Sequence, residues 1–241
     1  MKPIYLFRHL AWEGPGYLAT FLDRHGIALH LVPIDEGAAP PSTVDDAGAL
    51  VFMGGPMSVN DPLPWIDQEC DLIREAMARN MPVLGHCLGG QLIAKALGGT
   101  VSANPVREVG WFAVEQRPEG RDNPWLQDLP TRFEVLHWHG ETFSVPAGAT
   151  PLLRSAHCVN QAFSMGSALA LQFHVEMTEA MVEQWATHNR EDLAHPSRTV
   201  QTPEQLRENL SARVAALNRI ADRLYTRWLG LVTQHHQRTT R

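Results

Sequence analysis

The chemically informative feature of this chain is a single cysteine held between glycines in the segment GHCLGGQ, residues 85–91. An apolar run, residues 81–84, comes directly before it, and a helical pattern, residues 91–97, follows it. Strand, tight turn and helix in this order form the cysteine version of the elbow that exposes a catalytic nucleophile. The peptide dipoles at a helix N-terminus favour the thiolate form of Cys87. The segment therefore predicts covalent catalysis.

A nucleophilic cysteine needs an acid–base partner, and the segment LALQFHVE, residues 169–176, offers one. The segment predicts a strand that ends in His-x-Glu, and strand alternation places His174 and Glu176 on the same side. His174 is then the candidate acid–base group, and Glu176 is the carboxylate that holds the imidazole in its useful tautomer.

Backbone donors for an oxyanion are the third requirement of such a site. The apolar run 51–53 ends in two glycines and a proline, residues 54–56, at the carboxyl end of a predicted strand. We expect the N–H of Gly55 and the N–H of Leu88, directly after the cysteine, to face the same point.

The elements that must position these residues are apolar, β-rich segments separated by Gly, Pro and Asp. They cover residues 4–7, 28–34, 49–53, 82–86, 111–114, 133–137 and 169–174. Helical patterns at 16–25 and 64–79 fall between the early segments. Alternating strands and helices predict an α/β fold with a doubly wound, mostly parallel sheet of the flavodoxin-like type. Residues 100–167 predict antiparallel strands added at one edge.

The pattern is helical after residue 177. A first segment, 178–188, precedes a proline-containing break, and an amphipathic stretch follows over residues 206–228. We therefore predict a catalytic domain over 1–190 and a helical extension over 196–241. We expect the extension to pack either on the domain or on a partner chain. If the partner is a second copy of this chain, the helix forms a homodimer.

Three motifs taken together resemble the class I glutamine amidotransferases, the triad-type glutaminases. These are Gly-x-Cys-x-Gly-x-Gln at 85–91, Gly-Gly-Pro at 54–56 and His-x-Glu at 174–176. The similarity covers about residues 1–190. The segments 53–59 and 137–141 look like those of stand-alone GMP-synthase-like amidotransferase domains.

The resemblance implies that Cys87 attacks the side-chain amide of glutamine and that His174 protonates the departing ammonia. A γ-glutamyl thioester forms and is hydrolysed, with Glu176 orienting the imidazole. The oxyanion donors are the N–H groups of Gly55 and Leu88. The resemblance also assigns contacts with the substrate to Gly54, Gln91, Trp138, His139, Gly140 and Glu141.

We expect neither a cofactor nor a metal. His137 and His139 have the spacing of metal ligands, but no third ligand stands near them in the sequence. The chain contains no glycine-rich phosphate loop, and no synthetase domain follows the amidotransferase segment. The expected partner is therefore a separate synthetase or another ammonia acceptor.

Composition and charge indicate the class of protein, its cellular compartment and its binding partners. Its 241 residues are 44% hydrophobic and 19% charged, and no apolar run approaches the roughly 18 residues of a membrane-spanning helix. Three cysteines and an N-terminus without a signal-peptide core predict a cytoplasmic protein. Residues 1–195 carry 12 basic and 23 acidic side chains, and residues 196–241 carry 8 and 3. The acidic body gives the basic tail a closer partner than nucleic acid, so we expect no nucleic-acid binding.

Two other functions stay open at this point. The same Cys-His-Glu site would also serve a stand-alone hydrolase of γ-glutamyl peptides or amides. A non-catalytic, thiol-sensing protein on the same fold is the alternative from another class, although its sensing cysteine would have less need of the acid–base pair.

Overall fold

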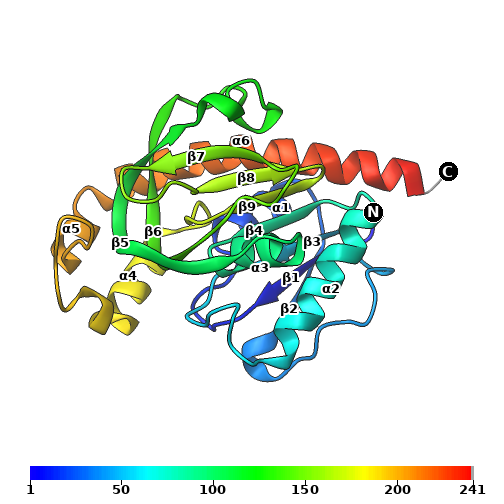
Figure 1. Cartoon of the computed structure of the whole chain (residues 1–241), viewed down its shortest axis with the longest axis horizontal. Helices are drawn as coiled ribbons and strands as arrows, with labels where there is room; N and C mark the ends of the chain where they lie inside the picture. Colours follow the sequence, from blue (N-terminus) through cyan, green and yellow to red (C-terminus); the bar gives the residue numbers. More distant parts are fainter. Residues whose placement is uncertain (240–241) are drawn as a thin grey trace.

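A computed structural model describes residues 1–239 as one nine-stranded sheet with helices on both faces (Figure 1). The strand order is β2-β1-β3-β4-β9-β8-β7-β5-β6. The first five strands in this order are parallel: β2 (Leu29–Pro33), β1 (Ile4–Arg8), β3 (Ala49–Phe52), β4 (Val83–His86) and β9 (Ala168–Leu171). The others are antiparallel: β8 (Ala162–Met165), β7 (Thr150–Ser155), β5 (Val101–Gln116) and β6 (Arg132–Phe143).

The helices occupy the connections of the parallel half and the end of the chain. They are α1 (Tyr17–Arg24), α2 (Pro64–Ala78), α3 (Leu88–Ala96), α4 (Glu179–His188), α5 (Pro203–Arg207) and α6 (Leu210–Thr239). Short 3-10 turns lie at η1 (Ile34–Glu36), η2 (Pro118–Gly120), η3 (Pro124–Leu126) and η4 (Arg190–Leu193). Across residues 1–239, none of the helices has a stretch long and apolar enough to cross a membrane.

The parallel strands are buried on both faces, and alternate residues face different cores. In β3, Leu50 and Phe52 pack in the core that contains α2 and α3, whereas Ala49 and Val51 pack in the core that contains α1, α4 and α6. A strand covered on both faces needs apolar residues throughout. This explains why the sequence of β3 is a continuous apolar run.

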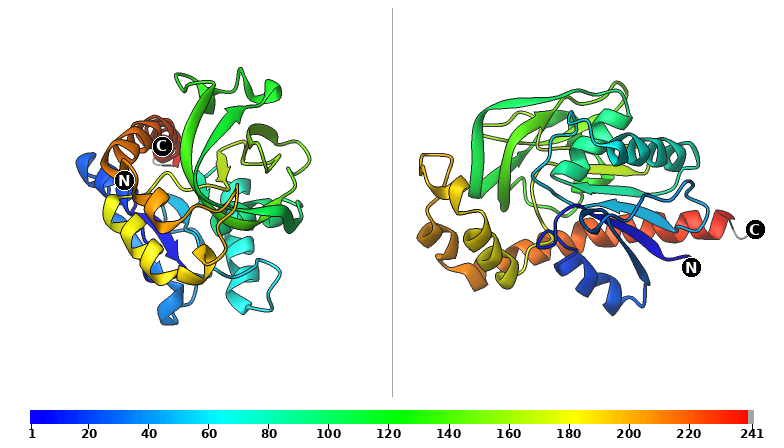
Figure 2. Two further views of the ribbon diagram at one scale, coloured as in Figure 1. Left: turned by 90° about the vertical axis from the view of Figure 1, so that its left-hand side faces the viewer. Right: turned by 90° about the horizontal axis from the view of Figure 1, so that it is seen from below.

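The antiparallel half curls away from the plane of the parallel half, as the green strands in Figure 2 show. Strands β5 and β6 form a long hairpin that contains the shorter segments predicted at 111–114 and 133–137. Strand β6 then reaches the chain just beyond β9, where the N–H of His174 donates a hydrogen bond to the carbonyl of Leu136 at 2.9 Å. This bridge brings β6 against the end of β9.

Several element boundaries differ from the predicted ones. Strand β9 ends at Leu171, so residues 172–176 form an irregular segment with one isolated bridge at His174. Helix α3 begins at Leu88, directly after the cysteine. The stretch predicted as one helix over 206–228 is broken at Asn209, whose positive φ of 53° cannot belong to a right-handed helix.

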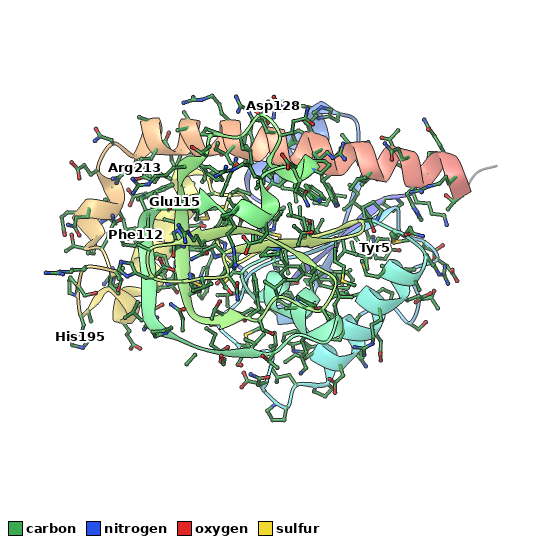
Figure 3. The ribbon with its side chains drawn as sticks, turned by 45° about the horizontal axis from the view of Figure 1, so that its top comes forward. Tyr5, Phe112, Glu115, Asp128, His195 and Arg213 are labelled. Atoms are coloured by element: carbon green, nitrogen blue, oxygen red, sulfur yellow. The ribbon has the colours of Figure 1, made fainter. Side chains whose placement is uncertain are left out.

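Helix α6 lies along the same side of the sheet as α1 (Figure 2, right). Its buried side chains recur at three- and four-residue spacing and join the core of the chain itself: Val214, Leu217, Ile220, Ala221, Leu224, Tyr225, Trp228 and Val232. Polar contacts flank this apolar face. The Tyr17 hydroxyl donates to Asp222 at 2.8 Å, and Arg213, which Figure 3 places at the β5 end of the helix, lies 3.1 Å from Glu134.

The burial of α6 yields a stability prediction. Trp228→Ala is expected to lower the free energy of unfolding by about 3–5 kcal/mol, because a fully buried aromatic side chain is lost and a cavity remains. Chemical denaturation measures this loss. The exposed neighbour gives the control, since Arg227→Ala is expected to change stability by less than about 0.5 kcal/mol. Equal effects of the two changes would show that α6 does not rely on its apolar face.

Candidate active site

The cysteine lies at a strained turn between β4 and α3. Cys87 has a φ of 51°, a left-handed value that is uncommon outside glycine, and only 6% of its surface is exposed. Its N–H donates to the carbonyl of Leu171 in β9 at 2.8 Å, and its carbonyl accepts from Gln91. A side chain at Gly89 would collide with the carbonyl of Phe52 in β3. The first turn of α3 thus packs closely against both β3 and β9, and the sulfur lies at the edge of the sheet.

The predicted acid–base pair meets at this sulfur. Nδ1 of His174 lies 2.6 Å from Oε1 of Glu176, and both side chains are almost fully buried. Burial disfavours the charged imidazole, but the Glu176 carboxylate and the sulfur of Cys87 outweigh it and raise the pKa of His174 well above its usual value. Burial alone would raise the pKa of Glu176, yet His86 and His174 hold it at about 2. The pair is arranged to carry an imidazolium beside the sulfur.

A second layer of side chains connects this pair to the C-terminal helix. Nε2 of His86, the last residue of β4, lies 3.7 Å from the other carboxylate oxygen of Glu176. The same nitrogen lies 3.2 Å from the hydroxyl of Tyr225 in α6. Helix α6 therefore contacts the support of the candidate catalytic pair as well as the core.

The proposed oxyanion donors lie on two neighbouring elements. The N–H of Leu88 opens α3, and Gly55 follows β3; within residues 1–239 neither N–H donates a backbone hydrogen bond. The loop after β3 is fixed by a buried pair, because His9 contacts the Met53 carbonyl at 3.1 Å and the Glu69 carboxylate at 3.0 Å. This pair sets the position of Gly55.

A cavity of about 560 Å³ opens over the sulfur and brings most of the predicted residues together. Its lining includes Gly55, Cys87, Gln91, Trp138, His139, Gly140, Glu141 and His174. Three predicted residues lie behind the wall, namely Gly54, Leu88 and Glu176. A side chain at Gly54 would collide with the Glu13 carboxylate and come within 3.0 Å of the His174 ring.

Several polar contacts shape the cavity wall. Nε2 of Gln91 donates to Gln172 at 3.3 Å, and Nε2 of Gln172 lies 3.7 Å from the sulfur of Cys87. The backbone carbonyl of Trp138 also lies 3.7 Å from this sulfur, and Glu141 accepts from the Ser58 hydroxyl at 3.2 Å. The wall thus offers both donors and acceptors to a ligand.

Several lining residues were not predicted from the sequence, among them Trp185, Asp192, Arg107 and Glu13. The edge of Trp185 packs on the ring of His174 with the ring centroids 4.7 Å apart. Asp192 accepts from the indole of Trp138 at 2.8 Å and from Arg107 at 2.6 Å. Glu13 lies in the loop after β1, and burial raises the pKa of its carboxyl to about 7. Of these residues, only Glu13 could have been predicted from the sequence, because it follows a predicted parallel strand and loops at the carboxyl ends of such strands form ligand sites.

A group of possible metal ligands lies at the cavity wall, which His139 lines. The side chains of Glu108, His137 and His139 are buried, and one donor atom from each lies within 4.8 Å of the others. The prediction of no metal site rested on the absence of a third ligand near the two histidines. Strand β5 places a third side chain of the ligand type beside them, because Glu108 is paired in register with His139.

Comparison with known proteins identifies the class to which this fold and site belong. The sequence model of the family described as "Glutamine amidotransferase class-I" matches residues 17–185, and the chain belongs to this family. The resemblance and the fold class drawn from the sequence are thereby confirmed.

Two relatives differ in how much of their own length the chain covers. The chain is 29% identical over 192 residues to the glutamine amidotransferase-like protein YfeJ of Salmonella typhimurium, covering 77% of this chain and 80% of YfeJ. It is 34% identical over 161 residues to the GMP synthase of Thermomicrobium roseum, covering 64% of this chain but 28% of that protein.

A solved structure resembles the chain over its whole length. The crystal structure of a glutamine amidotransferase from Methylobacillus flagellatus superposes with a TM-score of 0.91 at 38% identity, covering 96% of this chain and 95% of that one.

The coupling between His174 and Glu176 yields a prediction about protonation. Glu176→Gln is expected to lower the pKa of His174, because the neutral amide no longer attracts the imidazolium. An NMR titration of the imidazole measures this shift. Glu191→Gln, an exposed change of the same type, is the control and should leave the titration unaltered.

The same change has a consequence for acid stability. Glu176 has a folded pKa of about 2 against an ordinary value of 4.5, so its contribution is present above pH 4.5 and is lost as the pH falls toward 2. The variant should therefore lose less stability than the parent in this window. The coupling between Glu176 and His174 would be contradicted if the variant kept the parent's His174 pKa and also lost as much stability as the parent when the pH falls from 4.5 toward 2.

Proposed function

We propose that this protein hydrolyses the γ-carboxamide of glutamine through a Cys87–His174–Glu176 triad and releases ammonia. The observation that carries the proposal is the buried His174–Glu176 pair, 2.6 Å apart, beside the cysteine of a strained strand–helix turn. Membership of the class I glutamine amidotransferase family supports the same chemistry.

The proposed reaction begins with attack of the Cys87 thiolate on the amide carbon. The negative charge that develops on the carbonyl oxygen is met by the N–H groups of Gly55 and Leu88. His174 then gives its proton to the amide nitrogen, the C–N bond breaks, and ammonia leaves. Acid catalysis is needed because an unprotonated amide nitrogen is a poor leaving group.

The second half of the reaction regenerates the Cys87 thiolate and the protonated His174. The γ-glutamyl group is now held as a thioester on Cys87, and His174 takes a proton from the attacking water. Collapse of the second tetrahedral intermediate breaks the C–S bond and releases glutamate. Glu176 keeps the imidazole in one orientation through both halves.

Substrate contacts are proposed for the cavity wall. Gln91 and the segment Trp138–Glu141 would hold the amino-acid end of glutamine, while Gly54 lies behind the wall and would act through close packing rather than contact. No cofactor enters this reaction.

The ammonia acceptor is proposed to be a separate synthetase or acceptor protein. The matched region corresponds to 28% of a GMP synthase, a glutamine-hydrolysing enzyme by its name. We further propose that residues 1–190 form the amidotransferase unit, with 196–241 as its helical extension. A cytoplasmic location is proposed from the three free cysteines.

The central prediction concerns the nucleophile. Cys87→Ala is expected to reduce ammonia release from glutamine by at least about 1,000-fold, because covalent catalysis is lost. A glutamine-analogue electrophile should add its mass to the peptide that contains Cys87, and mass spectrometry reads this directly. Cys158→Ala, a change at a buried cysteine outside the cavity, is the control expected to keep both properties.

Labelling of Cys87 without turnover of any amide would favour the thiol-sensing alternative. If Cys87→Ala retained ammonia release, the proposed mechanism would be wrong. Turnover of glutamine that depends on Cys87 supports it.

A second candidate function is the hydrolysis of a larger γ-glutamyl amide or peptide. The cavity of about 560 Å³ falls within the roughly 300–1,000 Å³ of sites for drug-sized ligands, which is more room than free glutamine needs. The Glu13 carboxyl lies beside Gly54 and the ring of His174, the proposed proton donor to the leaving nitrogen. A leaving amine with a second, cationic group would meet this carboxylate.

Glu13 therefore separates the two functions. For a γ-glutamyl diamine, Glu13→Gln is expected to lower kcat/KM by about 10- to 100-fold through loss of one charge-assisted contact. A γ-glutamyl alkylamide of the same length without the amine is the matched control, and its kcat/KM should change little. Turnover of glutamine alone, with neither longer amide accepted, would exclude this second function.

A further inference from the structure

A buried polar cluster lies in the antiparallel half, and one of its members also lines the cavity over Cys87. It consists of Glu108 from β5 and His137 and His139 from β6, with exposed fractions of 0%, 0% and 5%. The proposed hydrolysis of glutamine gives Glu108 and His137 no task, and it uses His139 only as part of the cavity wall. Buried ionisable groups are costly unless they are paired or bind an ion.

The hydrogen bonds of His139 leave a lone pair that faces a carboxylate. Nδ1 of His139 lies 3.0 Å from the backbone carbonyl of Glu141, which only accepts, so Nδ1 carries the ring proton. In the neutral ring Nε2 is then an acceptor, and it lies 3.2 Å from Oε2 of Glu108. Nε2 of Gln161 donates to Oε2 at 2.7 Å and lies at a long 3.4 Å from Nε2 of His139. This weak contact still leaves two acceptors 3.2 Å apart, an arrangement that a cation between them would stabilise.

The ring of His137 also lies beside the Glu108 carboxylate. Neither ring nitrogen of His137 has a hydrogen-bond partner among residues 1–239, although the side chain is fully buried. Its Nδ1 lies 4.0 Å from the same Oε2 of Glu108. Unpartnered buried polar atoms are rare in folded proteins, and each requires an explanation.

We propose that Glu108, His137 and His139 bind one divalent transition-metal ion of the Zn²⁺ type. Zn²⁺ bonds of about 2.0–2.2 Å in a tetrahedron place the ligand atoms about 3.3 Å apart. The carboxylate oxygen lies 3.2 Å from one histidine nitrogen and 4.0 Å from the other, and the three donor atoms lie within 4.8 Å of one another. The His137 ring would therefore move closer for all three atoms to bind one ion. Two imidazoles and one carboxylate favour Zn²⁺ over Mg²⁺ or Ca²⁺.

Neighbouring polar groups orient the Glu108 carboxylate through hydrogen bonds, as second-shell groups orient a metal ligand. The Ser155 hydroxyl donates to Oε1 of Glu108 at 2.7 Å, and Nε2 of Gln161 donates to Oε2 at 2.7 Å. The Glu141 carbonyl does the same for His139 by fixing its tautomer. Second-shell partners of this kind orient metal ligands and raise their affinity.

The backbone explains how the three ligands come together. The pairing of β5 with β6 shifts register between Ala103 and Glu108, and beyond the shift Glu108 stands opposite His139. A bulge of this kind re-aims the side chain that follows it. A bound ion would clamp β5 to β6 next to Trp138 and Gly140, which line the active-site cavity. The metal would thus fix the cavity wall without entering the reaction.

The test is a metal titration of the full chain after treatment with a chelator. Zn²⁺ binding is measured by calorimetry, and Co²⁺ binding by visible absorption, which reports the geometry and any sulfur ligand. We expect one ion per chain, bound without a thiolate charge-transfer band. Glu108→Gln, which keeps the shape of the side chain, should weaken binding by at least about 100-fold, and Ser155→Ala by about 10- to 100-fold.

Two control variants locate the bound ion. Cys87→Ser removes the thiol of the triad and should keep one ion per chain. His195→Ala removes an exposed histidine, which Figure 3 shows at the periphery of the molecule, and should also leave binding unchanged.

Two results would overturn the proposal. The first is binding that disappears in Cys87→Ser but persists in Glu108→Gln, which would assign the ion to the triad. The second is the absence of saturable binding by the parent chain, which would mean that the cluster holds no metal ion. If Glu108→Gln fails to fold, Co²⁺ absorption of Cys87→Ser still decides between these results.

Discussion

Close backbone packing at the first turn of α3 is the constraint on which the candidate site depends. Side chains at Gly89 and Gly90 would collide with backbone atoms of β3 and β9, respectively. The start of α3 therefore packs directly against β3, which is followed by Gly55, and against β9, which is followed by His174. This contact fixes the distance from Cys87 to both groups, and it holds the cysteine at a φ that costs about 1–3 kcal/mol without such support.

The buried charges of the site are held from several elements of the fold. Glu176 is flanked by His174 on one oxygen and by His86 on the other, and Tyr225 of α6 contacts His86 in turn. Partly satisfied polar networks destabilise a core, so each member needs its neighbours in place. The long helix thus supports a catalytic geometry to which it contributes no reacting atom, and its apolar face fixes where Tyr225 lies.

The sequence allowed the local features to be predicted and left the long-range ones open. The elbow at Cys87 and the His174-x-Glu176 motif are short segments whose chemistry depends on neighbours in the chain. The parallel half was predictable because its strands are continuous apolar runs. The position of Glu108 opposite His139 depends on a register shift within β5, and the contact of Tyr225 with His86 joins residues 139 positions apart. No spacing rule in one sequence reports either of these contacts.

The bridge between Leu136 and His174 also bears on how the protein folds. It joins β6 to a segment that follows three further strands, so a large loop must close before the contact can form. Loop closure of this kind costs chain entropy before it is repaid by contacts, and non-local strand pairing is slow for that reason. Strands β1 to β4, which belong to neighbouring strand–helix units, can form earlier, whereas β9 joins β4 only across the intervening strands. During refolding, secondary structure should therefore return before the imidazole of His174 reaches the sulfur.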